Sequence, residues 1–125
     1  MAHAHYDSAR ITLEGLIHDQ PDDARFHSAL GFAYAGLGRK DDAVREGKRG
    51  VELLPISKEA WRGARRARDM ARIQVVVGNY NEALADITML LSIPSEVSGT
   101  FLRIDPAWAP LRTLPEFQKL IAEKK

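Results

Sequence analysis

The sequence predicts an all-α chain in which antiparallel helix pairs stack into a superhelix, an α-solenoid, closed by short helices at its C-terminal end. Three observations lead to this prediction. Apolar residues recur at the spacing of three and four residues that marks one face of a helix, a set of positions repeats after 34 residues, and glycines stand where paired helices would turn. We expect residues 1–125 to form a single domain of this kind.

The composition is that of a folded globular chain. Its 125 residues suffice for one core, and the 45% hydrophobic and 28% charged residues are close to the average of folded domains. The 18 basic and 17 acidic residues leave a net charge of +1, so the balance of charge predicts neither a nucleic-acid partner nor a membrane surface. Apolar runs are only a few residues long, which predicts no membrane insertion. The absence of cysteine excludes disulfides and thiolate chemistry.

Residues 7–21 recur as residues 41–55. A period of this length is typical of repeats made of one helical hairpin, each of which buries its apolar face only by stacking on the next. The recurring residues are Asp7, Ala9, Ile17 and Pro21, which return as Asp41, Ala43, Val51 and Pro55.

The complete repeat, residues 24–57, begins with a predicted amphipathic helix. Asp22 or Asp23 can cap its N-terminus, and Gly36 and Gly38 can end it. Between them, apolar residues at i, i+4, i+7, i+8 and i+11 form one stripe. The stripe consists of Phe26, Leu30, Ala33, Tyr34 and Leu37.

A second helix completes this repeat and ends before Pro55. Asp41 and Asp42 fall in its first turn, where carboxylates favour the positive end of the helix dipole. Gly47 and Gly50 lie inside it, at a cost of about 1 kcal/mol each relative to alanine. We therefore expect a neighbouring helix to approach the backbone closely at both glycines.

A half repeat precedes the complete one at residues 6–21. It matches the second helix of a repeat whose first helix is missing, so its apolar face lacks a neighbour on one side. Exposed apolar faces recruit partners, and we expect a homo-oligomer formed through this half repeat. The residues concerned are Ile11, Leu13, Leu16 and Ile17.

An extended repeat follows at residues 58–94, with its turn glycine at Gly78. Gly78 comes 40 residues after the turn glycine of the complete repeat, which is six more than the period. We place the extra residues in a long first helix, residues 58–77, capped by Ser57.

The period does not continue into residues 95–125, where we expect short capping helices. Ser95 or Ser98 caps the first of them, Asp105 and Pro106 begin the second, and Pro115 begins the last.

The complete repeat resembles the tetratricopeptide repeat (TPR) family. It matches most positions of the family signature, with His27 where the signature prefers tryptophan. A second resemblance is carried by the stretches 91–95, 102–108 and 110–118: residues 57–120 resemble the C-terminal ends of bacterial TPR regions attached to adenylate cyclases, Ser/Thr kinases and winged-helix regulators. The positions that carry the family resemblance are Leu30, Gly31, Tyr34, Gly38, Ala43 and Pro55.

The resemblance implies a non-enzymatic scaffold for protein–protein interaction, which presents a concave groove to a peptide or a partner protein. The alternative is a regulatory, sensory or assembly segment of a larger bacterial signalling protein. A cytoplasmic location is expected for the scaffold, and a periplasmic or other extracytoplasmic segment of a membrane-anchored protein is the alternative. No cofactor is implied.

Catalytic and metal-binding patterns are not found in the sequence. The Gly36-Leu37-Gly38 string does not follow a strand, so it predicts no dinucleotide site. Neither a zinc-protease motif nor a nucleophile elbow is present. We predict no catalytic and no metal site. Trp61 and Trp108 are interpreted as core or interface residues rather than as ligand platforms.

Five arginines between positions 62 and 72 stand out, with only Asp69 against them. In TPR proteins the first helix of each repeat lines the groove, which implies that Arg65, Arg68 and Arg72, at i, i+3 and i+7, face it. Guanidinium groups suit carboxylates and phosphates, so an acidic protein or peptide is the expected partner. The expected groove residues are Arg25, Ser28, Phe32, Arg65, Arg68 and Arg72.

Two other interpretations of the arginines stay open. They can form a solvated helix face paired with Asp69 and Glu59, or they can contact nucleic acid, which the otherwise neutral chain disfavours. Ser28 and Phe32 stand where chaperone-binding TPR proteins carry a lysine and asparagine carboxylate clamp. The resemblance therefore does not extend to that class of partner.

Overall fold

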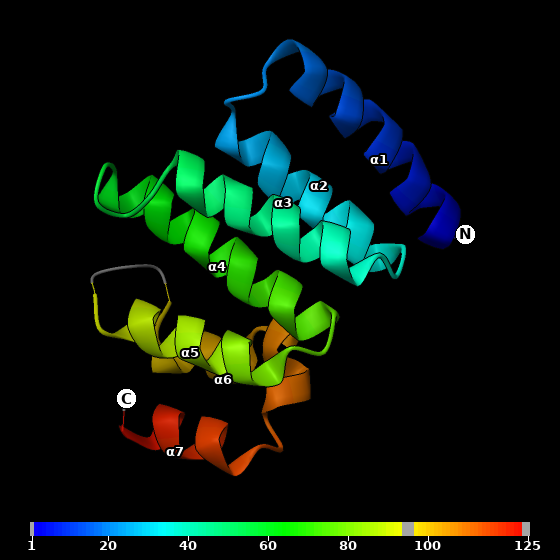
Figure 1. Cartoon of the computed structure of the whole chain (residues 1–125). Helices are drawn as coiled ribbons and strands as arrows, with labels where there is room; N and C mark the ends of the chain where they lie inside the picture. The colour runs from blue at the N-terminus through cyan, green and yellow to red at the C-terminus, as the bar shows by residue number, and fades with distance from the viewer. Residues whose placement is uncertain (1, 94–96, 124–125) are drawn as a thin grey trace.

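The computed structural model describes residues 2–93 and 97–123, and every regular element in these ranges is a helix (Figure 1). The all-α prediction is confirmed for this part of the chain. No helix in these ranges has both the length and the apolar character needed to cross a bilayer. The elements are α1 (Ala2–Asp19), α2 (Ala24–Gly36), α3 (Lys40–Leu53), α4 (Ala60–Val76), α5 (Tyr80–Leu91), α6 (Gly99–Ile104), the 3₁₀-helix η1 (Pro106–Leu111) and α7 (Pro115–Glu123).

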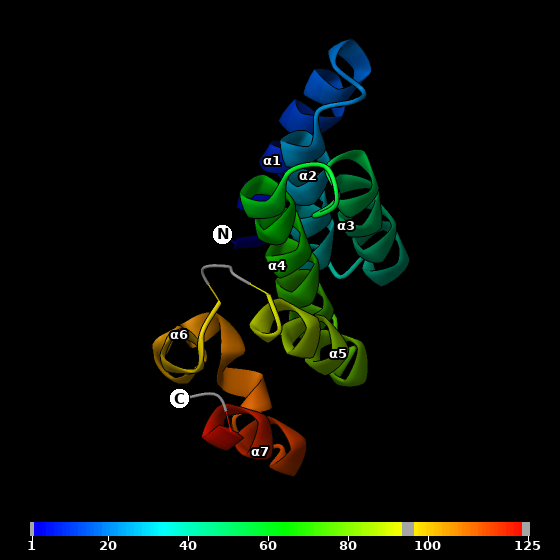
Figure 2. The same ribbon diagram turned by 90° about the vertical axis from the view of Figure 1, so that its left-hand side faces the viewer.

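Helices adjacent in the chain pack in pairs, and the pairs stack. α2 packs on α3 and α4 packs on α5, while α4 also contacts both α2 and α3. α1 packs on α2 at one end of the stack, and α6, η1 and α7 close the other end (Figure 1). Figure 2 shows α2 and α4 in one layer and α3 and α5 in a second, with α6 on the side of α2 and α4.

The two pairs turn through the same backbone geometry. Gly38 has φ +77° and Gly78 has φ +86°, a left-handed conformation that residues with a side chain rarely adopt. The next amide in each case donates back to the preceding helix, from Arg39 N to Tyr34 O at 2.9 Å and from Asn79 N to Gln74 O at 2.8 Å. The predicted turn glycines are therefore confirmed.

The two helices of the complete repeat, α2 and α3, begin as predicted. Asp23 caps α2, because its carboxylate accepts a hydrogen bond of 3.0 Å from the amide of Arg25. Asp41 and Asp42 fall in the first turn of α3.

The two glycines inside α3 are places of close helix contact, as expected. A Cβ atom at Gly47 would lie 2.8 Å from Sδ of Met70, and one at Gly50 would lie 2.6 Å from Oγ of Ser28 and 3.2 Å from the carbonyl oxygen of Ala24. α2 and α4 thus pack closely against the backbone of α3 at its two glycines. This close packing offsets the low helix propensity of glycine.

α4 starts later than the sequence predicts. The expected helix over residues 58–77 with Ser57 as its cap is wrong at its start: α4 begins at Ala60, its N-cap position is Glu59, and no side chain caps it. Its 17 residues span about 25 Å rather than about 30 Å.

The residues before α4 form a turn that explains the difference. The amides of Lys58 and Glu59 both donate to the carbonyl oxygen of Pro55, at 3.0 and 3.2 Å. This turn folds back against the helix at Gly63, where a Cβ atom would lie 2.6 Å from the amide nitrogen of Ile56. Part of the extra length of this repeat is therefore used in a turn instead of helix.

The C-terminal helices cap the stack largely as expected. Ser98 caps α6 by accepting from the amide of Phe101 at 3.1 Å, and Asp105 caps η1 by accepting from the amide of Ala107 at 3.0 Å. Ser95, the other predicted cap, lies outside the described residues. Trp108, predicted to be a core or interface residue, is fully buried in the core that the cap shares with α4 and α5.

Candidate partner-binding site

The arginines of α4 lie on a helix that is anchored by alanines. Ala64, Ala67 and Ala71 are at most 5% exposed and belong to the core shared with the C-terminal cap. Because alanine and arginine both have high helix propensity, this composition forms helix readily. Arg65 is exposed, and Arg68 is half-buried.

Arg72 connects α4 to α2. Its guanidinium carbon lies 5.1 Å from the centroid of the Phe32 ring, which is a cation–π distance. Both side chains are half-buried, and among the described residues no hydrogen-bond acceptor contacts the buried Nε of Arg72. The predicted groove residues of two different repeats therefore meet here, one from each helix.

Ser28 does not face a groove, and this prediction is corrected. Its side chain is 2% exposed and lies between α2 and α3, against Gly50. The missing side chain at Gly50 lets α3 approach α2 closely enough to cover Ser28. Ser28 therefore offers no surface to a partner.

Arg66 of the same helix partly neutralises the buried carboxylate of Asp69. Arg66 forms an ion pair with it at 3.0 Å, and the two side chains are only 15% and 10% exposed. Burial raises the pKa of Asp69, against the opposing effect of Arg66, Arg68 and Arg72. The open interpretation that Asp69 pairs with the arginines thus holds for Arg66.

A cleft of about 640 Å³ lies where the start of α2, the end of α3 and the first half of α4 meet. Its basic side chains come from two helices, and two leucines at the end of α3 also line it. The lining residues are Asp22, Asp23, Ala24, Arg25, Leu53, Leu54, Arg62, Arg65 and Arg66.

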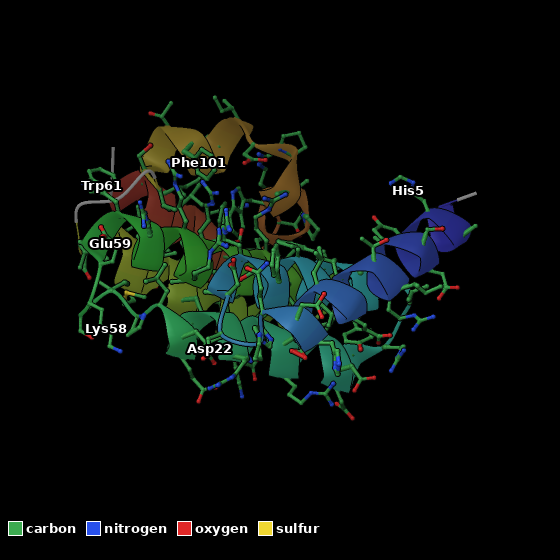
Figure 3. The ribbon with its side chains drawn as sticks, turned by 90° about the horizontal axis from the view of Figure 1, so that it is seen from above. His5, Asp22, Lys58, Glu59, Trp61 and Phe101 are labelled. Carbon is green, nitrogen blue, oxygen red and sulfur yellow. The ribbon has the colours of Figure 1, made fainter. Side chains whose placement is uncertain are left out.

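The α2 side of this cleft is acidic and partly self-neutralised. Arg25 is 73% exposed and pairs with Asp23 at 2.8 Å. The hydrogen bond from Arg25 holds the pKa of Asp23 below its usual value. Asp22 adds a further exposed carboxylate (Figure 3). The cleft therefore has an acidic edge on α2 and a basic wall on α4.

Trp61 is exposed at the beginning of α4 (Figure 3). Its side chain is 55% exposed, so Trp61 is not a core residue, and its role as an interface residue stays a prediction. It precedes Arg65 by one helical turn, which places both on the same side of α4. This i, i+4 spacing is the sequence signal that would have placed Trp61 with the arginines.

The six predicted groove residues therefore do not line a single groove. Arg25 and Arg65 line one cleft, Phe32 and Arg72 stack on each other, Arg68 is half-buried, and Ser28 is buried. Arg62 and Arg66 also line the cleft, and neither is among the predicted groove residues.

Groups of three or more side chains suited to holding a metal ion do not occur among the described residues. Arginine, aspartate and tryptophan in this arrangement can bind charged and aromatic groups of a partner. Comparisons with known proteins found no match to the chain among protein-family models, curated proteins or solved structures.

Proposed function

We propose that this chain is a TPR-like, non-enzymatic scaffold that holds an acidic segment of a partner protein in the cleft beside α4. The observation that carries the proposal is the placement of three arginines of α4 along one 640 Å³ cleft: Arg62 and Arg65 are exposed there, and Arg66 is paired with Asp69. The exposed ring of Trp61, one turn from Arg65, supports it.

The charge distribution favours carboxylates as the groups that bind. Guanidinium groups present a planar fork of donors that matches a carboxylate. An exposed ion pair contributes only about 0.2 to 1 kcal/mol, so several must act together with apolar contact. Tryptophan and arginine are the side chains most often found at the energetic centre of protein interfaces. Trp61 is not one of the residues that line the cleft, but it is exposed one helical turn before Arg65, where it can add apolar contact.

The proposal is tested with two exposed arginines of α4. The double variant Arg62→Gln with Arg65→Gln removes two charges from the cleft. The matched control, Lys40→Gln with Arg49→Gln, removes two charges from exposed positions of α3 that do not line the cleft. The probe is a short fluorescent peptide of alternating glutamate and leucine, and a lysine–leucine peptide serves as the charge-reversed control.

Fluorescence anisotropy should show that the acidic peptide binds the wild type and the control variant. We expect the affinity to fall by about tenfold in the cleft variant, as the loss of two such pairs implies, and to weaken with added salt. Equal affinity of all three proteins for the acidic peptide, or equal binding of both peptides to the wild type, contradicts the proposal.

A further inference from the structure

A second pocket, of about 420 Å³, lies between α3, α4 and α5. Its volume falls in the range of small-molecule sites in proteins. None of its lining residues lines the cleft described above. They are Lys48, Val51, Glu52, Ala67, Met70, Gln74, Asp86 and Met89.

Two methionines are among the apolar side chains that line this pocket. Met70 is 6% exposed, and its sulfur packs against the bare backbone at Gly47, so it is held in place. Met89 is 39% exposed. The unbranched, polarisable methionine side chain adapts to ligands of different shape. The pocket thus has one fixed and one more accessible thioether.

The charged side chains of the pocket are predominantly acidic. α3 contributes Lys48 and Glu52, α4 contributes the uncharged Gln74, and α5 contributes Asp86. Asp86 is half-buried, and none of the hydrogen bonds or ion pairs within residues 2–93 and 97–123 involves its carboxylate. A half-buried carboxylate without such a partner attracts a cation.

The pKa of Asp86 reflects the same environment. Burial, followed by the nearby charge of Glu82, raises it to about 6, although Lys48 acts in the opposite direction. The anionic form of Asp86 is therefore poorly compensated within the protein, and a bound cation would stabilise it.

We propose that this pocket binds a small alkylammonium ion, whose apolar body lies between Met70 and Met89 and whose ammonium group pairs with Asp86. The proposal is independent of the scaffold function, because it concerns different residues and a different class of ligand. The apolar lining accounts for the alkyl group, and the excess of carboxylates over ammonium groups accounts for the charge.

Methionine-methyl NMR tests this proposal directly. The chain contains 3 methionines, and the variants Met70→Leu and Met89→Leu assign the two pocket signals. The probe is n-hexylammonium, with n-hexanol and hexanoate as ligands of the same length without the positive charge. We expect hexylammonium to shift both signals along a saturable curve, with at least about tenfold weaker binding of the other two compounds.

The pH dependence of hexylammonium binding is a second test, and it needs no variant. Because Asp86 ionises around pH 6, the affinity for hexylammonium should rise about tenfold from pH 5 to pH 7. The affinity for hexanol should stay constant over the same range. Lys48, Glu52 and Glu82 are the other ionisable groups around Asp86, and the comparison with hexanol reports any change of shape that they cause.

The variant Asp86→Asn keeps the shape of the side chain and removes its charge. It should lose the preference for hexylammonium over hexanol, whereas the control Asp41→Asn, at an exposed carboxylate of α3, should retain it. Circular dichroism checks that both variants are folded. Unsaturable shifts, equal binding of the three compounds, or a preference that survives Asp86→Asn or does not change with pH would each overturn the proposal.

Discussion

The guanidinium of Arg72 on α4 lies over the ring of Phe32 on α2, with 5.1 Å between the guanidinium carbon and the ring centroid. These residues come from successive helix pairs, so the contact ties one pair to the next. It also orients an arginine whose Nε is buried.

A double-mutant cycle of Arg72→Gln and Phe32→Leu should measure this contact. Cation–π pairs contribute about 0.5 to 1 kcal/mol at exposed sites and about 2 kcal/mol when desolvated, and we expect a coupling energy between these values for two half-buried side chains. Urea unfolding gives the four stabilities. In the control cycle, the effects of Arg72→Gln and Tyr80→Leu on the free energy of unfolding should be additive. A similar coupling energy in both cycles would contradict a specific contact between Arg72 and Phe32.

Gly50→Ala should destabilise the protein by about 1 to 3 kcal/mol, because the added Cβ would lie 2.6 Å from Oγ of Ser28 and 3.2 Å from a backbone oxygen. Gly15→Ala is the matched control: a Cβ there meets nothing within 4 Å. That variant should gain about 1 kcal/mol from helix propensity alone. Chemical denaturation distinguishes the two results, and a loss of stability at both positions would argue against helix contact as the cause.

Asp86→Asn should stabilise the chain at neutral pH and not in acid. The folded state raises the pKa of Asp86 from 3.8 to about 6, so ionised Asp86 costs native stability. The penalty is absent below the unfolded pKa and is complete above pH 6. Since the side chain is only half-buried, we expect a gain of about 1 kcal/mol at pH 7. Stability curves of both proteins from pH 3.5 to pH 7.5 should diverge as the pH rises.

Tyr34→Phe should weaken the packing of α1 on α2. The hydroxyl of Tyr34 donates to the carboxylate of Glu14 at 2.7 Å, and Glu14 also accepts from Arg10 at 2.8 Å. Losing a hydrogen bond to a charged group costs about 1.5 to 3 kcal/mol.

Alkaline titration provides an independent check of this contact. Burial and the bond to Glu14 raise the pKa of Tyr34 to about 12, and stability should fall as the pH rises from 10 towards 12. The tyrosinate absorbance that develops last should be missing from the Tyr34→Phe variant. An unchanged titration would show that the hydroxyl is not in this environment.

Self-association through α1 stays a prediction. The structure leaves fewer of the expected apolar residues of α1 exposed for such a contact. Leu13 and Ile17 pack against the core that includes Tyr34, whereas Ile11 is 59% exposed. If an oligomer forms through this face, Ile11→Glu should lower its association constant in sedimentation equilibrium. A wild-type chain that is monomeric up to millimolar concentration would exclude it.

Helix positions and turns could be predicted because they depend on residues close in sequence. The cap at Asp23 and the turns at Gly38 and Gly78 are local features that single residues determine. The start of α4 depends instead on a turn that folds back against Gly63, and a contact between backbone segments leaves no periodic signal.

The candidate sites were harder to predict, because they depend on how helices approach each other. Ser28 is buried because Gly50 allows α3 to come close, a relationship between residues 22 positions apart. Trp61 is exposed although its size favours burial. The pocket at Asp86 combines side chains from three helices, and only their packing brings them together.

The left-handed glycines at the two hairpin turns also affect how the chain acquires its structure. Each one closes a loop of only a few residues, so the entropy lost in forming a helix pair is small. Pairing within each hairpin therefore needs no help from distant parts of the chain, and chains dominated by such short-range pairing fold fast. Folding can begin at either hairpin and then spread to its neighbour, as in a one-dimensional array.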